Sequence, residues 1–261
     1  MPRLDYVQSL SRGLEILEVI NRNGEMGISE VSEALKMDRS TVYRLISTLK
    51  AREYLKQNKA NSKYYCSLKT FEMGCRVVTK LGMGRQVKYI MEALAVSVGE
   101  SVNLGVLDGD DVVHIEKIES HETIKVDVGV GERMPSYSTS LGKAILAFLP
   151  QEQLSVLLKK MKFTKIAPNT ITDPRLLLEK LAEVRKKGFA VDDEEFAPGL
   201  KCFAAPVRDW SGSVIAAVSV AYPKYRYQKD LEGEQKIINA VLATAGKISS
   251  AFGFTQIPRT Y

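Results

Sequence analysis

The amino-acid sequence predicts an α+β protein with two domains of different architecture. Three observations support this fold class. Apolar residues recur with a helical period in three short segments before residue 51, two short basic strands with a turn between them follow, and the apolar pattern changes to a period of two from residue 101 onward. The 261 residues, of which 45% are hydrophobic, are enough for two modest hydrophobic cores.

Two helices are predicted first. One lies within residues 6–22, is stopped by Asn23-Gly24, and has an apolar face. That face is expected to consist of Leu10, Leu14, Ile16, Leu17 and Ile20. The next helix lies within residues 27–37, and we expect Ser29 to be its N-cap, with Glu33 close to the capping-box position.

The third predicted helix is MDRSTVYRLISTLK, residues 37–50. Its apolar positions are spaced i, i+3, i+4 and i+7, and either Asp38 or Ser40 can cap its first turn. The opposite face is rich in hydrogen-bond donors and carries Arg39, Ser40, Thr41, Tyr43, Arg44, Ser47 and Lys50. Because three or four residues separate it from the preceding helix, the two are expected to cross at a steep angle.

A basic hairpin is predicted after the third helix. Residues 54–57 and 63–66 have strand character, and residues 59–62 form the turn between them. This order of elements is that of a winged helix-turn-helix, in which the third helix enters the major groove and the hairpin, or wing, lies near the DNA backbone. We therefore expect DNA contacts from the third helix and also from Arg52, Lys59, Asn61 and Lys63. A basic face that is merely solvated is the alternative.

The charge distribution favours a polyanionic partner for this first domain. Residues 1–85 carry 15 Lys and Arg against 9 Asp and Glu, whereas the rest of the chain carries 22 of each. A localised basic segment suits double-stranded DNA better than a diffuse excess would. No apolar run is long enough to cross a bilayer, and the amino terminus lacks the apolar core of a signal peptide, so we expect a cytoplasmic protein without a membrane partner.

Residues 68–98 are predicted to be mostly helical, with a break at residues 82–84, Gly-Met-Gly. The part before the break has an apolar stripe that consists of Leu68, Phe71, Cys75, Val78 and Leu81. Such a stripe packs either against a second copy of the chain or against its own domain, and the sequence leaves both open. We expect the DNA-binding domain to cover residues 1–69, the linker helix 70–84 and the second domain 85–261.

The second domain is predicted to be a mixed α/β domain of the sensor type. Two strands are expected within residues 102–120, around a turn at 108–110. Further strands are expected at residues 123–131, 189–195, 200–207 and 212–222, and helices at 138–150, 174–188 and 230–251.

The sequence contains no recognisable catalytic or cofactor-binding motif. No GxSxG, HExxH or Walker-type pattern occurs, and His114 and His121 have no partner at a metal-ligand spacing. The three cysteines are too widely spaced for a disulfide framework or a CxxC metal site. Residues 192–195, Asp-Asp-Glu-Glu, are expected to form a solvated acidic loop with one member turned inward rather than a metal site. We therefore expect no enzyme activity, no cofactor and no metal.

One segment suggests a binding site for a small anion. Residues 138–140, Ser-Thr-Ser, precede a helix that begins near Leu141, and free amide hydrogens with small hydroxyls at a helix start favour an anion. Gly142 has no side chain to block the approach, and an apolar strand face with Val126 and Val128 is expected opposite. This combination favours a small organic acid over a neutral hydrocarbon.

Four segments together resemble the IclR family of bacterial transcriptional regulators: SLSRGLEILEVI, ISEVSEALKMDRSTVYRLISTLKAREYL, MPSYSTSLGKAILAFLP and VDDEEFAPGLKCFAAPV. The resemblance implies an amino-terminal winged helix, a GAF-like effector-binding domain, and homodimers that often pair into tetramers. It also implies small carboxylates or aromatic acids as effectors. By position, it places the effector pocket at Val126, Ser140, Leu141, Asp192, Cys202 and Ser219, with Thr123 and Ala221 as further positions.

The chain departs from the family pattern at three places. Glu53 stands where a glycine usually begins the wing, Cys66-Ser67 replaces Leu-Gly after the second wing strand, and Ser140-Leu141 is bulkier than the small pair of some relatives. The predicted function is a DNA-binding repressor controlled by a small organic acid. The alternatives are an enzyme fused to a DNA-binding domain and a ligand-free architectural protein. The missing catalytic motif argues against the first, and the large, neutral second domain argues against the other.

Overall fold

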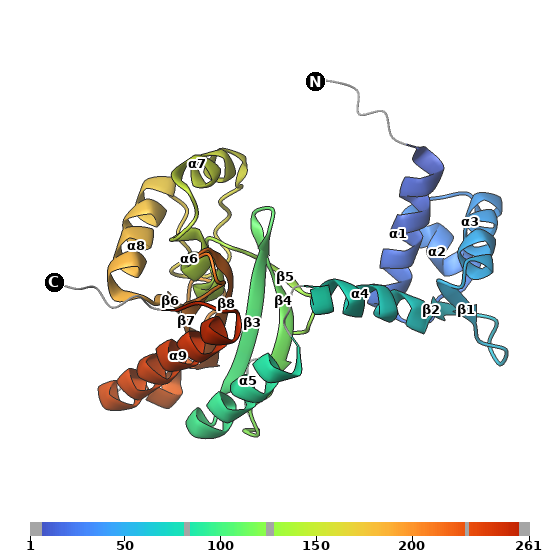
Figure 1. Ribbon diagram of the computed structural model, residues 1–261. Coiled ribbons are helices and arrows are strands. Elements are labelled where there is room, and N and C mark those ends of the chain that lie inside the picture. The colour runs from blue at the N-terminus through green and yellow to red at the C-terminus, as the bar shows by residue number, and fades with distance from the viewer. Residues whose placement is uncertain (1–6, 81–83, 124–127, 228–229, 256–261) are drawn as a thin grey trace. The chain divides into compact units, whose positions relative to one another are not determined.

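The computed structural model describes residues 7–80, 84–123, 128–227 and 230–255, with only the backbone described at residue 75 and at residues 77–80. Figure 1 shows its helices and strands. The chain divides into two compact units, Met1–Leu81 and Gly82–Tyr261, which are described separately below.

The amino-terminal unit has the predicted order of helix, helix, helix, hairpin and helix. Its elements are α1 (Gln8–Asn23), α2 (Ile28–Leu35), α3 (Arg39–Ala51), β1 (Leu55–Gln57), β2 (Tyr64–Cys66) and α4 (Leu68–Lys80). The strands β1 and β2 pair antiparallel and form the wing. The backbone groups of Met26 and Tyr64 exchange hydrogen bonds of 2.9 and 2.8 Å, which tie β2 to the segment between α1 and α2.

The buried face of α1 differs from the predicted one. Gly13, Ile16 and Ile20 are buried, whereas Leu10 and Leu14 are 64% and 52% exposed. Positions 10 and 14 are rotated by about 60° and 100° from position 13 on a helix of 3.6 residues per turn, so both lie on the flank of the buried stripe. The prediction that Leu10 and Leu14 face the core is therefore wrong.

The caps of α2 and α3 illustrate one wrong and one correct prediction. The N-cap of α2 is Gly27, whose backbone N–H donates to the Glu30 carboxylate at 2.6 Å, instead of the predicted Ser29 and Glu33. For α3, Asp38 is the cap: its carboxylate accepts from the backbone N–H groups of Ser40 and Thr41, at 2.9 and 3.2 Å.

The carboxy-terminal unit is built on one antiparallel sheet of six strands in the order β5-β4-β3-β8-β7-β6. The strands are β3 (Ser101–Asp108), β4 (Asp111–Ile118), β5 (Arg133–Pro135), β6 (Ala190–Asp193), β7 (Leu200–Arg208) and β8 (Val214–Pro223). The helices are α5 (Arg85–Val98), α6 (Ser140–Leu146), α7 (Gln151–Lys160), α8 (Pro174–Lys187) and α9 (Leu231–Ala251), with a 3₁₀ helix η1 (Lys224–Tyr227) before α9.

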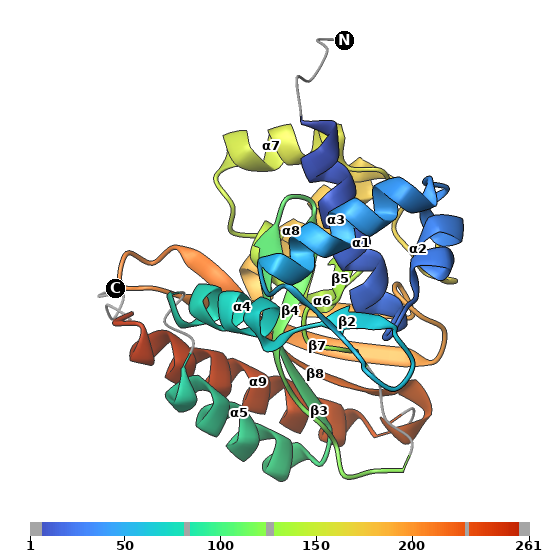
Figure 2. The same cartoon turned by 90° about the vertical axis from the view of Figure 1, so that its right-hand side faces the viewer.

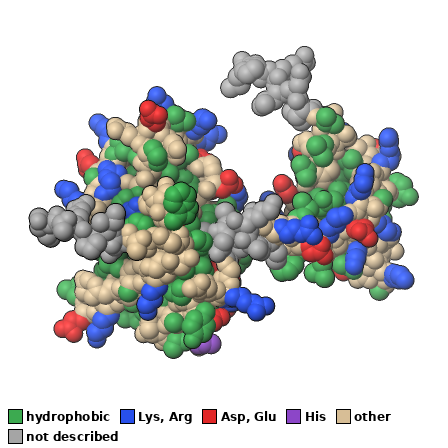
Figure 3. Space-filling view, in the orientation of Figure 1, with side chains coloured by type: hydrophobic (Ala, Val, Ile, Leu, Met, Phe, Trp, Pro, Cys, Tyr) green, Lys and Arg blue, Asp and Glu red, His purple; other side chains and the backbone are tan. Residues whose placement is uncertain are grey.

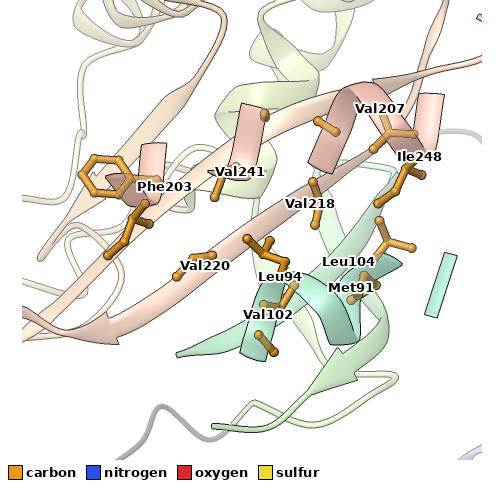
Figure 4. Close-up of a cluster of buried hydrophobic side chains, with 14 of the residues drawn as sticks. Met91, Leu94, Val102, Leu104, Phe203, Val207, Val218, Val220, Val241 and Ile248 are labelled. Atoms are coloured by element: carbon orange, nitrogen blue, oxygen red, sulfur yellow. The ribbon is translucent and has the colours of Figure 1, made fainter. Parts of the chain in front are cut away.

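The two faces of this sheet carry different residues because side chains alternate along each strand. One face packs against α5 and α9, which lie side by side in Figure 2. The largest hydrophobic core of the unit lies there; Figure 4 labels Met91, Leu94, Val102, Leu104, Phe203, Val207, Val218, Val220, Val241 and Ile248 from it. The opposite face packs against α6 and α8 through smaller residues such as Ala190, Ala204 and Ala217.

The predicted fold class, an α+β protein with an amino-terminal winged helix-turn-helix and a mixed α/β second domain, is confirmed. The helices α7 and η1 and the short strand β5 were not predicted. Of the strand predicted at 123–131, residues 124–127 lie outside the described residues, and residues 128–131 form no strand. They turn instead, with Gly131 at a φ of 89° and its N–H donating to the His114 carbonyl at 2.7 Å.

Candidate nucleic-acid interface and buried cavity

The outward face of α3 carries the residues predicted to contact DNA. Val42 and Ile46 are fully buried and fix the helix to α1 and α2, so the opposite side is left to solvent. Exposed there are Arg39, Ser40, Tyr43, Arg44, Ser47 and Lys50, while Thr41 is half-buried. Figure 3 shows lysine and arginine side chains along the α3 and wing side of this unit. The face offers donors for base edges and phosphates, as a recognition helix requires.

The wing residues are more engaged than the sequence suggested. Lys59 at the tip is exposed. Asn61, however, donates to a Glu25 carboxylate oxygen at 2.7 Å, and the Lys63 ammonium pairs with Glu30 at 2.7 Å. Hydrogen bonds, chiefly from Asn61, lower the pKa of Glu25.

Glu25 and Glu30 were not predicted, because they lie more than 30 residues away in sequence and only the docking of the wing brings them close. At the end of α3, the Lys50 ammonium donates to the Gln57 side chain at 2.9 Å, and Arg52 is exposed.

The two family departures at the wing are connected in space. Glu53 has a φ of 63°, the left-handed conformation that glycine adopts without cost, which explains why a glycine usually begins the wing. The buried Ser67 hydroxyl donates to the Glu53 carbonyl oxygen. A glycine at position 67 would lack this donor. Ser67, directly after β2, therefore holds Glu53, two residues before β1, in its left-handed conformation.

In the carboxy-terminal unit, five of the six predicted pocket positions line one cavity of about 30 Å³ between the sheet and α6. They are Ser140, Leu141, Asp192, Cys202 and Ser219, and Ala221 lines it too. Val126 lies outside the described residues, and Thr123 is exposed and does not line the cavity. Seven further residues complete the lining: Asn103, His114, Val128, Met134, Thr139, Phe196 and Leu200.

The strand register explains why residues far apart in sequence meet at this cavity. Cys202 pairs with Asp192 on one side and with Ala221 on the other, so the three form one row across β6, β7 and β8. Asn103 pairs with Ser219 in the next row of the same face. Sequence reasoning missed Asn103 because a single polar residue in an apolar strand carries no signal until its neighbours are known.

Asp192 is the acidic residue among the described residues of the cavity wall and is 1% exposed. One of its carboxylate oxygens accepts from the backbone N–H groups of Glu195 and Phe196, at 2.8 and 3.3 Å. Burial raises its pKa to about 7, although the nearby Lys143 ammonium opposes this rise. Lys143 is itself 2% exposed and pairs with the Glu195 carboxylate.

The acidic stretch 192–195 is therefore not a solvated loop. Asp192 and Glu195 are turned inward, whereas Asp193 and Glu194 both pair with the Lys224 ammonium, at 2.7 and 2.6 Å. Over the residues that the structure describes, no group of three or more His, Cys, Asp and Glu side chains is arranged to hold a metal ion. A search of the same residues finds no helix with the length and apolar character of a membrane span.

The start of α6 differs from the predicted anion site in one respect. Thr139 is the N-cap, and its hydroxyl accepts from the Gly142 N–H at 3.1 Å. A side chain at Gly142 would meet the backbone of Ser136, with its Cβ only 2.1 Å from the Ser136 carbonyl oxygen. The absence of a side chain at Gly142 thus allows the close approach of the Ser136 backbone. The prediction that it leaves space for a ligand is wrong.

Comparison with known proteins assigns the family. The model of the IclR helix-turn-helix domain matches residues 9–59, and the model of the bacterial transcriptional regulator IclR C-terminal domain matches residues 75–250. The chain is 34% identical to the HTH-type transcriptional regulator KdgR of Escherichia coli, over 97% of the chain and 96% of KdgR. It is 30% identical to the HTH-type transcriptional repressor AllR of the same organism, over 96% of the chain and 92% of AllR. The crystal structure of Thermotoga maritima IclR, 30% identical, superposes with a TM-score of 0.76 and covers 95% of this chain and all of that one. The family matches cover nearly the whole length of a chain with a winged helix-turn-helix in one unit and a mixed α/β domain in the other. They make this chain a transcriptional regulator of the IclR family and not an enzyme.

Proposed function

We propose that this regulator is a repressor whose operator binding is controlled by a small organic acid in the cavity of the carboxy-terminal unit. The observation that carries the proposal is the start of α6 at the cavity wall. The backbone N–H groups of Ser140 and Leu141 donate to no partner within the described ranges of the chain, and both residues line the cavity. Free first-turn amides favour a carboxylate.

The remaining lining residues complement such a ligand. With its carboxylate at the Ser140 and Leu141 amides, the ligand would have Cys202 against its carbon skeleton, together with Val126 as the family resemblance implies. Asp192 and Ser219 would then bind a polar group of the ligand. An ionised carboxylate beside a ligand carboxylate would be costly, so Asp192 is expected to be protonated or to bind a hydroxyl.

DNA binding is assigned to residues 1–69, with residues 70–84 as the linker and residues 85–261 as the effector-binding, GAF-like domain. The α3 residues from Arg39 to Lys50 would read the major groove of a double-stranded operator. Arg52, Lys59, Asn61 and Lys63 would contact the backbone from the end of α3 and the wing. For Asn61 and Lys63, this requires that they leave their present acidic partners. Such a role places the protein in the cytoplasm, where the chromosome lies.

We further propose that the chain acts as a homodimer, with a dimer of dimers as the larger assembly. Four leucine and phenylalanine side chains of the amino-terminal unit support this: Leu10 and Leu14 on α1 and Leu68 and Phe71 on α4 are all more than half exposed. Leu10 and Leu14 are about one turn apart on α1, as are Leu68 and Phe71 on α4, and neighbouring apolar side chains at a surface favour contact with another protein surface. Two winged helices would also read a two-fold symmetric operator.

The test is an effector titration of the preformed protein–operator complex with a panel of small carboxylates. Ser140→Asp places a negative charge at the proposed carboxylate site and should abolish the response while operator binding in the absence of acid is retained. Ser155→Asp, which adds the same charge to the exposed face of α7, is the matched control. If the Ser140→Asp protein, verified as folded by its melting curve, responds at wild-type concentrations, the carboxylate binds elsewhere.

A further inference from the structure

Two buried polar atoms on the cavity wall have no hydrogen-bond partner among the described residues. They are Oδ1 of Asn103 on β3 and Nδ1 of His114 on β4. The two residues are only 3% and 4% exposed. Native proteins leave few buried polar groups unpaired, because each such group loses its hydrogen bonds to water without replacement. Two such atoms on one cavity wall indicate that a bound molecule supplies their missing hydrogen bonds.

The positions of these two residues in the sheet place them on the same face. Asn103 pairs with Ser219 on β8, and His114 pairs with Gly105, two residues along β3 from Asn103. Both side chains line the cavity that also contains Ser140 and Asp192. The residues at the start of α6 and the Asn103–His114 pair therefore line one cavity, whose present volume of about 30 Å³ must enlarge before an organic acid can enter.

The charge of this part of the cavity disfavours a second carboxylate. Burial lowers the pKa of His114 to about 4, with Glu132 opposing the shift and Lys117 adding to it, so the imidazole is neutral at physiological pH. No lysine or arginine is among the described lining residues, and the neighbouring Lys143 is paired with Glu195. A carboxylate here would lose its hydration without gaining a positive partner.

A hydroxyl group matches what the pair offers. The amide oxygen of Asn103 accepts a hydrogen bond, and a neutral imidazole has one nitrogen that donates and one that accepts. A hydroxyl donates one hydrogen bond and accepts up to two. It can therefore donate to the Asn103 amide oxygen and accept a hydrogen bond from Nδ1 of His114 when that nitrogen carries the proton. A plain methyl or methylene group in the same place would leave both polar atoms unpaired.

We propose that Asn103 and His114 form a hydroxyl-binding subsite, so that the effector of this regulator is a hydroxylated acid and not a plain carboxylic acid. The inference rests on the proposed function, since it adds a ligand hydroxyl to the ligand carboxylate that the cavity is proposed to bind. It also predicts that these two residues contribute specificity and not stability.

The test compares acids that share a carbon skeleton and differ in hydroxyl groups: gluconate with hexanoate, and 4-hydroxybenzoate with benzoate. Release of a labelled operator and the thermal shift are measured for the wild type, Asn103→Leu and His114→Phe. Thr244→Val, at a buried position of α9 outside the cavity lining, is the control. A hydroxylated acid should act on the wild type and the control at a concentration about tenfold or more below that of its plain counterpart. Both cavity variants should lose that preference and melt at or above the wild-type temperature.

The outcomes separate this inference from the proposed function. If plain and hydroxylated acids act equally on the wild type, or if the preference persists in both cavity variants, the subsite is wrong and the acid-responsive repressor stands. Cavity variants that melt well below the wild type would show that Asn103 and His114 have structural partners, which also overturns the subsite. If no acid of either kind changes operator binding or melting, the proposed function fails and the subsite fails with it.

Discussion

Asp192 and His114 line the same cavity and should make opposite contributions to the pH dependence of stability. Burial raises the pKa of Asp192 from 3.8 to about 7. Between these values the native state binds more protons than the unfolded state, so the Asp192 contribution increases stability as the pH falls from 7 towards 4. Burial lowers the pKa of His114 from 6.5 to about 4, so the unfolded state binds more protons in that range. The His114 contribution therefore decreases stability as the pH falls from 6.5 towards 4.

The size of each contribution follows from the pKa values, since one pKa unit corresponds to about 1.4 kcal/mol. Between pH 8 and pH 5, the Asp192 contribution should gain about 3 kcal/mol, and the His114 contribution should lose about 2 kcal/mol. The two nearly cancel in the wild type. Asp192→Asn should therefore leave the loss at His114 uncompensated, and stability should fall towards pH 5 relative to the wild type. His114→Phe should do the opposite.

Urea unfolding at several pH values between 5 and 8 measures these differences. Circular dichroism follows both units, and the fluorescence of Trp210, the single tryptophan, follows the carboxy-terminal unit. Every variant keeps the charged neighbours of the two residues, so their own contributions to the free energy of unfolding cancel when a variant is compared with the wild type. These neighbours are Lys143 and Glu195 for Asp192, and Glu132 and Lys117 for His114. Free-energy differences between each variant and the wild type that stay constant from pH 5 to pH 8 would refute the reasoning.

Three further predictions concern the DNA-binding face and the start of α6. Arg44→Ala should weaken operator binding by about 1–3 kcal/mol in an anisotropy titration, with the melting temperature unchanged, because the side chain is exposed and within reach of a guanine edge or a phosphate. Glu30→Gln should strengthen operator binding in the same titration, because Lys63 then reaches a phosphate without first leaving Glu30, whereas Glu33→Gln on the same helix should leave the affinity unchanged. Gly142→Ala should destabilise the protein by about 1–3 kcal/mol or more in urea unfolding, because its Cβ would overlap the Ser136 backbone.

Each of these has a clear contrary result. Full operator affinity in the Arg44→Ala protein would mean that α3 is not the reading helix. Equal operator affinity for Glu30→Gln and the wild type would mean that Lys63 does not approach DNA. A Gly142→Ala protein as stable as the wild type would show that the Ser136 backbone can move aside.

Helical periodicity predicted the DNA-binding unit well because each helix there buries one stripe against its neighbours. The buried Val42 and Ile46 and the exposed Arg44 of α3 follow directly from their spacing. The same rule failed for Leu10 and Leu14, which are exposed. Periodicity shows that a helix has an apolar side, but it does not show whether the elements packed against that side cover its full width.

The carboxy-terminal unit was less predictable because its site depends on strand pairing. Nothing in the local sequence indicates that Asp192 is buried against Cys202, and an Asp-Asp-Glu-Glu run suggests a solvated loop until the register is known. Gly142 is a second example. The sequence singled it out, but its close neighbour is the backbone of Ser136, which lies six residues earlier, directly after β5. The family resemblance supplied the pocket positions that local patterns could not.

The alternation along β8 has a consequence for how such regulators can diversify. Val218 and Val220 belong to the core under α5 and α9, while Ser219 and Ala221, their immediate neighbours in sequence, line the cavity. Substitutions at the second pair would alter the shape and polarity of the cavity and leave the first pair, which packs against the helices, in place. If the cavity binds the effector as proposed, a duplicated copy of the gene could acquire a new inducer through changes at a few alternate positions, with the larger core under α5 and α9 unchanged.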